Sequence, residues 1–428
     1  MPKSLEEWLS YLESLHPKNI ELGLDRTNEV KQRLGLDPSF TIITVAGTNG
    51  KGSTCAMLEA ILRAAGYRVG CYTSPHLLRY NERVRIGGTE VDDESLCRAF
   101  EAVELARGEI SLTYFEFGTL AATWLFHQER LDAAILEVGL GGRLDAVNAF
   151  DPDCAIVTSV DLDHMDYLGE DRESIGHEKA GVFRAGKPAV CADPSPPRSL
   201  LEHARETGAD LKCIGPDFGA DMRDGQWLFR SKGGWCLSLP LPALRGAYQL
   251  GNASASLAAL EALQHRLPIT PENIRCGLLE ATVPGRFQVL PGKPVVILDV
   301  AHNPHAAGAL AGNLGQMWCA GKTITVFAML ADKDIAGVID ALRGQIDLWL
   351  VAGIEHARGA SADALESQLR LAGIGAVQTF SSIAAAYRHA CQIAGEDDRI
   401  AAFGSFYTVA EVMQQEPRFD GKQPLPHR

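Results

Sequence analysis

Several features that mark particular protein classes are missing from this sequence of 428 residues. It has no run of about 18 consecutive apolar residues, so a membrane-spanning helix is not expected. Its start carries Glu6, Glu7 and Glu13, whereas a secretory signal peptide begins with basic residues. We therefore expect a cytoplasmic protein with no membrane partner.

Basic charge and paired cysteines are also scarce. Lys and Arg number 40 against 54 Asp and Glu, so the formal net charge is −14 and no nucleic-acid partner is expected. The ten cysteines are scattered, and the closest two, Cys55 and Cys71, are 16 positions apart. No C-x-x-C motif for metal or redox chemistry occurs. Isolated cysteines are typical of buried, reduced thiols in a cytoplasmic protein.

Apolar β-branched runs alternate with helical patterns over most of the chain. Strands are expected at 41–46, 68–72, 133–138, 155–160 and 188–191, and helices at 51–65, 94–107, 117–129 and 198–207. Gly66 follows the first helix, where a left-handed residue is expected. This alternation predicts a parallel α/β sheet that is covered by helices on both faces.

The pattern changes in the middle of the chain. Two short apolar runs within 226–239 flank Lys232-Gly233-Gly234 and predict a β-hairpin. Helices are expected at 252–265 and 271–281, the second with Thr270 as its N-cap. Residues 283–294 include three prolines and two glycines, so this segment is the best candidate for a domain boundary and hinge.

Strand and helix patterns alternate again after the boundary. Strands are expected at 295–299, 323–329, 347–351, 377–380 and 400–403, and helices at 305–314, 335–343, 362–371 and 383–393. We therefore predict an α/β protein with a phosphate-loop domain over 1–285 and a smaller α/β domain over 286–428.

A glycine-rich turn lies between the first expected strand and the first expected helix. It reads Gly47-Thr48-Asn49-Gly50-Lys51-Gly52-Ser53-Thr54. Backbone N–H groups in such a turn, the helix N-terminus and the lysine favour binding of nucleotide phosphates. The turn departs from G-x-x-x-x-G-K-[ST], because Val45 replaces the first glycine and Gly52 separates the lysine from Ser53. A glycine turn without a ligand is the alternative, but it leaves the lysine unexplained.

Polar residues occur at the ends of three further strands. Ser74 follows the second strand, Glu137 ends another and His164 follows a third. The carboxyl ends of parallel strands meet at one edge of the sheet, so these residues are expected near the phosphate loop. A hard cation that bridges phosphates needs only a few protein ligands. A structural ion pair for Glu137 and a capping or surface role for His164 stay open.

Asp299 ends a strand of the second domain and is followed by Val300-Ala301-His302-Asn303-Pro304. Its carboxylate is suited to accept hydrogen bonds from a ribose or an amine. The same residues also fit a simple Asn-Pro helix start, so the sequence leaves both interpretations open.

Taken together, the motifs resemble those of the folylpolyglutamate synthase family of Mur-type ATP-dependent amide ligases, and within it the bacterial bifunctional dihydrofolate synthase/folylpolyglutamate synthase subgroup. In chain order they are E-L-G-L-D-R at 21–26, A-G-T-N-G-K-G-S at 46–53, Y-T-S-P-H-L at 72–77, T-Y-F-E-F-G-T at 113–119, E-V-G-L-G-G-R-L-D-A at 137–146, H-E-K-A-G at 177–181, P-G-R-F at 284–287 and D-V-A-H-N-P at 299–304. The resemblance implies a Mur-ligase-like phosphate-loop ATPase domain with a parallel sheet and a smaller Rossmann-like C-terminal domain. The glycine after Lys51 belongs to this family's pattern.

The resemblance also implies roles for the matching residues. ATP would be held by Thr48, Asn49, Gly50, Lys51, Asn252, Arg286 and Asp299, and magnesium by Ser74, Glu137 and His164. Pteroate would contact Glu21, Leu22, Thr113, Tyr114, Phe115, Glu116, Leu144, Asp145 and Ala146. Lys179 would be carbamylated beside a second metal ion, although its local sequence predicts a plain surface lysine on a helix. His302 would lie near glutamate or the nucleotide, and with Lys51 and Lys179 it completes the implied catalytic set.

The implied activity is ATP-dependent joining of L-glutamate to dihydropteroate and to reduced folates through an acyl phosphate, with two Mg²⁺ ions as cofactors. A monofunctional folylpolyglutamate synthase and another Mur-type amino-acid ligase are alternatives. A ligase for nucleotide-linked cell-wall precursors would need a further N-terminal domain, and only 40 residues precede the phosphate-loop strand. A nucleotide-gated switch would need the loop alone. We expect a monomer, because no exposed apolar stripe is evident.

Overall fold

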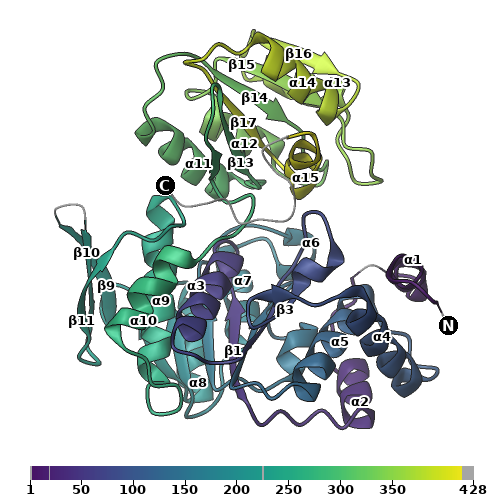
Figure 1. Ribbon diagram of the computed structural model, residues 1–428, viewed down its shortest axis with the longest axis vertical. Coiled ribbons are helices and arrows are strands. Elements are labelled where there is room, and N and C mark those ends of the chain that lie inside the picture. Colours follow the sequence, from purple (N-terminus) through teal and green to yellow (C-terminus); the bar gives the residue numbers. More distant parts are fainter. Residues whose placement is uncertain (1, 19, 224–225, 417–428) are drawn as a thin grey trace. The chain divides into compact units, whose positions relative to one another are not determined.

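The computed structural model describes residues 2–18, 20–223 and 226–416. The chain divides into two compact units, one formed by Met1–Ala243 and Tyr248–Thr282 and the other by Leu244–Ala247 and Val283–Arg428. The main crossing from the first unit to the second, at residues 282–283, adjoins the proline-rich segment 283–294. Each unit contains its own mostly parallel sheet (Figure 1).

The first unit is built on an eight-stranded sheet with the order β4-β3-β2-β5-β1-β6-β7-β8. Its strands are β1 Thr41–Ala46, β2 Val69–Tyr72, β3 Val84–Ile86, β4 Thr89–Glu90, β5 Ala133–Glu137, β6 Cys154–Val157, β7 Pro188–Cys191 and β8 Asp210–Cys213. β3 and β4 form an antiparallel edge beside β2, and the other strands run parallel. Every residue of β1, β5 and β6 is buried, which explains their continuous apolar runs.

Helices surround this sheet. Those before residue 283 are α1 Leu5–Leu15, α2 Asp25–Arg33, α3 Lys51–Ala64, α4 Asp93–Arg107, α5 Tyr114–Gln128, α6 Met165–Leu168, α7 Arg172–Ala180, α8 Arg198–Thr207, α9 Ala247–Ala262 and α10 Pro271–Glu280, with 3₁₀ turns at Tyr80–Arg83 and Ala146–Ala149. α10 packs tightly on α3, since a Cβ at Gly277 would lie 2.4 Å from the Cα of Ile61. Trp8 of α1 contacts Phe100 of α4 and Phe117 of α5, so these three helices share one apolar cluster.

A three-stranded antiparallel sheet follows in the chain, with the order β11-β10-β9. Its strands are β9 Phe218–Arg223, β10 Gln226–Ser231 and β11 Cys236–Pro240. β10 pairs with β11, which confirms the predicted hairpin. β9 is not predicted from the sequence, because Gly219 and Asp221 are both unfavourable in strands. Its pairing along the whole of β10 supplies the hydrogen bonds that outweigh this preference.

The second unit has a six-stranded sheet with the order β12-β13-β17-β14-β15-β16, parallel except for β12. Its elements are β12 Gln288–Leu290, β13 Val295–Asp299, α11 Pro304–Gln316, β14 Thr323–Phe327, α12 Ile335–Leu342, β15 Leu348–Ala352, α13 Ala362–Leu371, β16 Val377–Phe380, α14 Ile383–Ile393, β17 Arg399–Phe403 and α15 Phe406–Gln415. The rings of Phe327, Trp349 and Phe403 meet in its core, with centroids 5.2 to 6.0 Å apart. The predicted α/β fold class, with two mostly parallel sheets, is confirmed.

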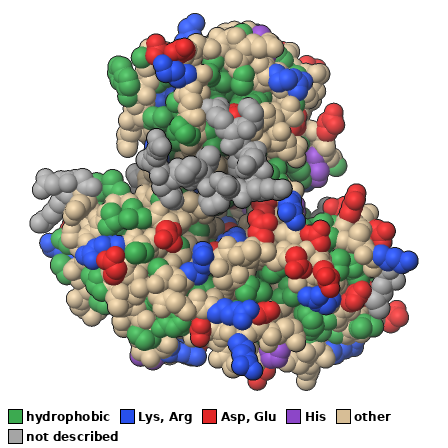
Figure 2. All heavy atoms as spheres, viewed as in Figure 1, with side chains coloured by type: hydrophobic (Ala, Val, Ile, Leu, Met, Phe, Trp, Pro, Cys, Tyr) green, Lys and Arg blue, Asp and Glu red, His purple; other side chains and the backbone are tan. Residues whose placement is uncertain are grey.

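Within the described ranges, no helix is long and apolar enough to cross a bilayer. Acidic and basic side chains are interspersed over the face shown in Figure 2. All ten cysteines are free thiols, and five of them are buried. The expectation of buried thiols therefore holds for half of them, whereas Cys236 and Cys391 are exposed.

Candidate active site

Four neighbouring strands of the first sheet, β2, β5, β1 and β6, run parallel and end side by side. Ser74 follows β2, Glu137 ends β5, the phosphate loop follows β1 and His164 follows β6. Because these strands share one direction, all four segments lie at the same carboxyl edge of the sheet. The fold thus brings to one edge residues that are widely separated in the sequence.

The phosphate loop is a strand–turn–helix connection in which two positions require glycine. Gly47 and Gly50 have φ angles of 146° and 92°. A Cβ at Gly47 would lie 1.9 Å from Thr158 Oγ1, and a Cβ at Gly50 would lie 2.5 Å from Asn252 Oδ1. These close approaches place Asn252, a residue that the resemblance assigns to ATP, directly against the loop.

Hydrogen bonds hold this loop against the segment that follows β6. The amides of Thr48 and Asn49 donate to the carbonyl and the hydroxyl of Ser159, at 2.8 and 3.1 Å. Thr48 Oγ1 donates to the Asp161 carbonyl at 3.1 Å and accepts from the Asp161 amide at 2.9 Å. The Lys51 ammonium donates to two loop carbonyls at 3.0 and 3.3 Å, so its charge lies on the loop itself.

Glu137 lies beside both the phosphate loop and Ser74. Its side chain is buried, and its Oε2 accepts a hydrogen bond from the Ser74 amide at 3.0 Å. A Cβ at Gly52, in the first turn of α3, would lie 3.9 Å from the same oxygen. Ser74, Glu137 and the helix that begins with Lys51 therefore meet at one point.

The side chains present fit a magnesium ion. Mg²⁺ takes oxygen ligands, commonly one or two carboxylates, and completes its coordination with water and substrate phosphates. A serine hydroxyl and a buried carboxylate next to a phosphate loop match this mode. Across the described part of the chain, no group of three or more His, Cys, Asp or Glu side chains is arranged to hold a metal by itself. Ser74 and Glu137 would therefore depend on the nucleotide to complete such a site.

His164 occupies a different environment from Glu137. Its backbone is left-handed, with φ of 52°, and it immediately precedes α6. Its amide donates to Asp163 Oδ1 at 2.9 Å, and its side chain is 34% exposed. It lies three residues after Asp161, whose backbone is hydrogen-bonded to Thr48, and therefore near the phosphate loop at the same sheet edge.

Lys179 is buried on α7, so the prediction of a surface lysine is wrong. Its relative exposure is 4%, and its pKa falls from 10.5 to about 7. Burial is the main cause and the charge of Lys51 the second, while Asp163 and Asp145 act in the opposite direction. Lys179 thus belongs to the same cluster as the phosphate loop. The sequence held a signal for this burial, because Ile175 lies four positions before Lys179 and residues with this spacing share one face of a helix.

Asp145 is the second buried group with an unusual pKa. Burial raises the pKa of its carboxyl to about 7, although backbone hydrogen bonds and Lys51 oppose this rise. Its two oxygens accept from the amides of Leu140 and Val147, at 2.8 and 3.0 Å. The carboxylate therefore shapes the turn between β5 and the 3₁₀ turn Ala146–Ala149.

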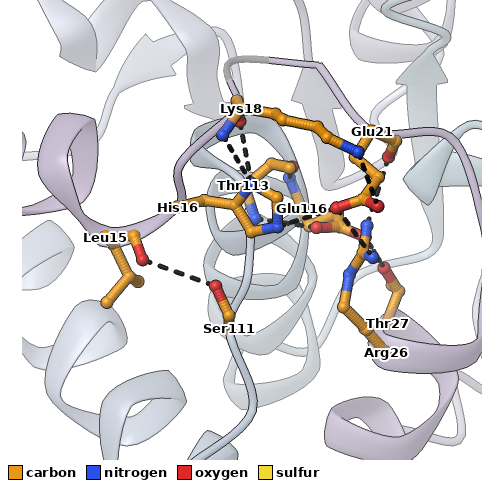
Figure 3. A network of polar contacts seen from close by, with 9 residues as sticks. All are labelled: Leu15, His16, Lys18, Glu21, Arg26, Thr27, Ser111, Thr113 and Glu116. Atoms are coloured by element: carbon orange, nitrogen blue, oxygen red, sulfur yellow. Dashed lines mark hydrogen bonds and ion pairs between the residues drawn. The ribbon is translucent and has the colours of Figure 1, made fainter.

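A network of polar contacts connects the first residues assigned to pteroate (Figure 3). Arg26 donates to Glu21 Oε2 at 3.2 Å and to Glu116 Oε1 at 3.0 Å. Glu116 Oε2 also accepts from the Thr113 amide at 2.7 Å, which caps α5. His16 Nε2 lies 2.9 Å from Glu21. The sequence did not predict a site role for Arg26 or His16. Arg26 occurs only as the last residue of the motif at 21–26, and His16 belongs to no motif.

The remaining pteroate positions lie close to this network. The Gly23 amide donates to the Leu144 carbonyl at 3.2 Å, which joins the segment of Glu21 and Leu22 to that of Leu144, Asp145 and Ala146. A Cβ at Gly139 would lie 2.6 Å from the ring of Phe115, so this ring lies against the end of β5. Tyr114 is the first residue of α5, beside Phe115. The structure thus gathers the three predicted segments around the start of α5.

Arg286, Asp299 and His302 belong to the second unit. Asp299 accepts from the amides of Phe287 and Ala301, both at 2.8 Å, and burial raises its pKa while Arg286 opposes the rise. The Arg286 guanidinium lies 5.0 Å from the centre of the Phe406 ring, and the His302 ring lies 6.1 Å from it. Arg286 and His302 therefore both lie near Phe406, and Asp299 interacts with the Arg286 charge. The side chain of Asn303 caps α11, which confirms the helix-start interpretation; a nucleotide contact of Asp299 stays a prediction.

Comparison with known proteins identifies the family. Residues 45–260 match the Mur ligase middle domain, and residues 285–406 match the Mur ligase glutamate ligase domain. The chain is 49% identical over 411 residues to the dihydrofolate synthase/folylpolyglutamate synthase of Escherichia coli strain K12. The aligned region covers 96% of this chain and 95% of that protein. This chain belongs to the dihydrofolate synthase/folylpolyglutamate synthase family of Mur ligases.

Solved structures of this family share the fold. Escherichia coli FolC in complex with DHPP and ADP is 48% identical, with a TM-score of 0.92 over 97% of this chain and 98% of that chain. A bifunctional folylpolyglutamate synthase/dihydrofolate synthase with Mn, AMPPNP and L-glutamate bound is 50% identical, with a TM-score of 0.90 over 96% of this chain and 98% of that one. The resemblance to this synthase family is therefore confirmed.

Proposed function

We propose that this synthase family member is an ATP-dependent ligase that joins L-glutamate to dihydropteroate, making dihydrofolate, and to reduced folates, extending their glutamate tail. Family membership over 96% of the chain supports this activity. The structural observation that carries the proposal is that Lys51 and Glu137 both lie at the phosphate loop and the start of α3. The ammonium lies on the phosphate loop, and the carboxylate lies beside the first turn of the same helix.

The chemistry explains why ATP is needed. A carboxylate is a poor acyl donor, because its leaving group would be oxide. An oxygen of the acceptor carboxylate first attacks the γ-phosphorus of ATP, the bond to the β–γ bridging oxygen breaks, and ADP leaves. The α-amine of glutamate then attacks the acyl carbon, the bond to phosphate breaks, and the amine loses a proton. The products are an amide and inorganic phosphate, so the protein has to position the reactants and neutralise charge.

For the nucleotide, we assign the ATP phosphates to Thr48, Asn49, Gly50 and Lys51, and further nucleotide contacts to Asn252, Arg286 and Asp299. A bound Mg²⁺ ion would neutralise phosphate oxygens, and Ser74, Glu137 and His164 are the residues proposed to hold it. The family structure with Mn and AMPPNP supports a requirement for a divalent metal. His302 is proposed to contact glutamate or the nucleotide, and residues 283–294 are the proposed hinge.

We further propose that Lys179 is carbamylated. The neutral amine attacks CO₂, a nitrogen–carbon bond forms, and one proton is lost, which leaves an anionic carbamate. A pKa of about 7 supplies the neutral amine that this step needs. The Lys51 charge disfavours a second ammonium nearby, and the same charge would stabilise a carbamate anion. A second metal ion is proposed to bind beside this group.

Pteroate is proposed to bind at the start of α5. The nine residues assigned to it lie on the three segments that Arg26, Glu116 and the Gly23–Leu144 hydrogen bond join. Carboxylates suit the N–H donors of a pterin ring, and the Phe115 and Tyr114 rings suit its aryl part.

We propose a cytoplasmic monomer that acts on small molecules and binds neither nucleic acid nor membrane. The net charge of −14 supports the assignment of no nucleic-acid partner, and the ten free cysteines support a reducing compartment.

The test is ATP-dependent incorporation of labelled glutamate, with dihydropteroate and tetrahydrofolate supplied separately. Incorporation with both acceptors is expected. Incorporation with tetrahydrofolate alone would indicate a monofunctional folylpolyglutamate synthase. Release of ADP that depends on neither acceptor would overturn the proposal. Hydroxylamine trapping of the acyl phosphate would separate a ligase from a nucleotide-gated switch.

A further inference from the structure

Arg83 is a half-buried cation without a carboxylate partner among the described residues. Its Nε donates to His76 Nδ1 at 2.8 Å. By contrast, other arginines of the first unit that are at least partly buried have carboxylate partners, among them Arg26, Arg85 and Arg107. Removing a cation from water without pairing it is costly, so an unpaired guanidinium in this position indicates an anionic ligand.

Arg83 lies near two sets of residues, the one proposed to hold the metal and the one proposed to bind pteroate. The Arg83 carbonyl accepts a hydrogen bond from the Thr73 amide at 2.9 Å. Ser74, which follows Thr73, donates its amide hydrogen to Glu137. The Arg83 guanidinium carbon lies 5.6 Å from the centre of the Tyr114 ring, the first residue of α5. Arg83 therefore lies between the residues assigned to the metal and those assigned to pteroate.

Aromatic rings surround this guanidinium. It lies 5.4 Å from the centre of the Tyr80 ring, which contacts Tyr114 edge-on at 5.9 Å. Tyr80 and Tyr72 are buried, with relative exposures of 3% and 0%, whereas Tyr114 and Phe115 are partly exposed. The Tyr72 and Phe115 centroids lie 5.9 Å apart. Such rings pack well against an aryl group, and a guanidinium at their edge pairs with a carboxylate. An aryl carboxylate has both features.

We propose that Arg83 binds the carboxylate of the acceptor that ATP activates, which in dihydropteroate is the aryl carboxylate. This inference rests on the proposed function, because it names the group by which the same acceptor is held. Nε is already used by His76, so the two Nη atoms form the fork that donates to the carboxylate oxygens. Arg83 thereby holds this carboxylate beside the segment of Ser74, while the aryl ring lies against the partly exposed rings of Tyr114 and Phe115.

The test compares two ligands that differ only in this carboxylate, pteroic acid and 6-(anilinomethyl)pterin. Their dissociation constants are measured by calorimetry with the full chain and Mg-ADP, for the unchanged protein, Arg83→Met and Arg83→Lys. The control is Arg79→Met on the preceding turn, because Arg79 is 63% exposed. Arg83→Met is expected to weaken pteroic acid binding about 10- to 100-fold and to change binding of the uncharged ligand less than about twofold. Arg83→Lys should keep part of the preference for pteroic acid over the uncharged ligand, since lysine retains the positive charge but not the paired N–H donors of the guanidinium.

An equal loss for both ligands in Arg83→Met would show that the guanidinium only supports the aromatic cluster, and no loss for either would show that it does not contact the acceptor. Either result overturns the proposal. Should Arg83→Met fail to fold, Arg83→Lys decides, because an unchanged ratio of the two dissociation constants would contradict a bidentate contact. Glutamate incorporation by the unchanged protein is measured separately. Its absence would overturn the ligase proposal and leave the binding ratio as an independent result.

Discussion

The buried amine of Lys179 allows a quantitative test of the site's electrostatics. Its pKa of about 7 compares with 10.5 in the unfolded chain. Each pKa unit is worth about 1.4 kcal/mol, so keeping this group in the folded protein costs roughly 5 kcal/mol below pH 7. The folded pKa is lowered, so the unfolded chain binds the extra proton between pH 7 and 10.5. The penalty therefore fades as the pH rises through this window.

The perturbation is Lys179→Met, which keeps the length of the side chain and removes the titration. The free energy of unfolding is measured by urea denaturation in CO₂-free buffer at pH 7 and at pH 9.5, for the variant and the unchanged protein. The variant should be the more stable at pH 7, and its advantage should shrink by about 3 kcal/mol at pH 9.5. Lys187→Met is the control, because it removes a lysine whose side chain is 47% exposed and lies at the surface.

The same stability difference at both pH values would refute the reasoning, because it would mean that the Lys179 ammonium is not disfavoured in the folded protein. The neutral amine required for a carbamate would then be missing near pH 7. Adding bicarbonate extends the test. It should stabilise the unchanged protein and leave Lys179→Met unaffected, since only the lysine forms a carbamate that favours the folded state.

Three further predictions concern the phosphate loop, the metal and the acceptor segment. Lys51→Ala should lower turnover at least about 100-fold with an unchanged melting temperature, and retained turnover would show that the loop is misassigned. Glu137→Gln should raise the magnesium concentration for half-maximal activity roughly tenfold or more, and an unchanged magnesium titration would contradict a ligand role. Arg26→Met leaves the Glu116 carboxylate, 4% exposed, without its cation, so the free energy of unfolding should fall by about 2 kcal/mol or more. The same change should raise KM for dihydropteroate and not for ATP, and an equal rise in both would indicate general loosening of the unit.

Local chemistry made several elements predictable from the sequence. The strand, glycine turn and helix around Lys51 follow from an apolar run, two positions that only glycine fits and a helix start, all within a few residues. Thr270 caps α10 as predicted, because capping depends only on the adjacent backbone amides. β9 and the burial of Lys179 were not predictable in this way. Both depend on partners that lie elsewhere in the chain, namely β10 and the cluster around Lys51.

The sequence by itself determined the alternation of strands and helices, the glycine turn and, through its motifs, the family. Each of these depends only on residues that are close together in the chain. Only the tertiary structure decided that Glu137 lies beside Ser74 and Gly52, that Arg26 joins Glu21 to Glu116, and that Arg83 has aromatic neighbours and no carboxylate partner among the described residues. The first of these contacts depends on the strand order β2-β5-β1-β6, which sets far-separated segments side by side at one edge of the sheet, and the others depend on how helices and edge strands pack around it. Strand order arises from the packing of the whole sheet and its helices, so no local pattern encodes it.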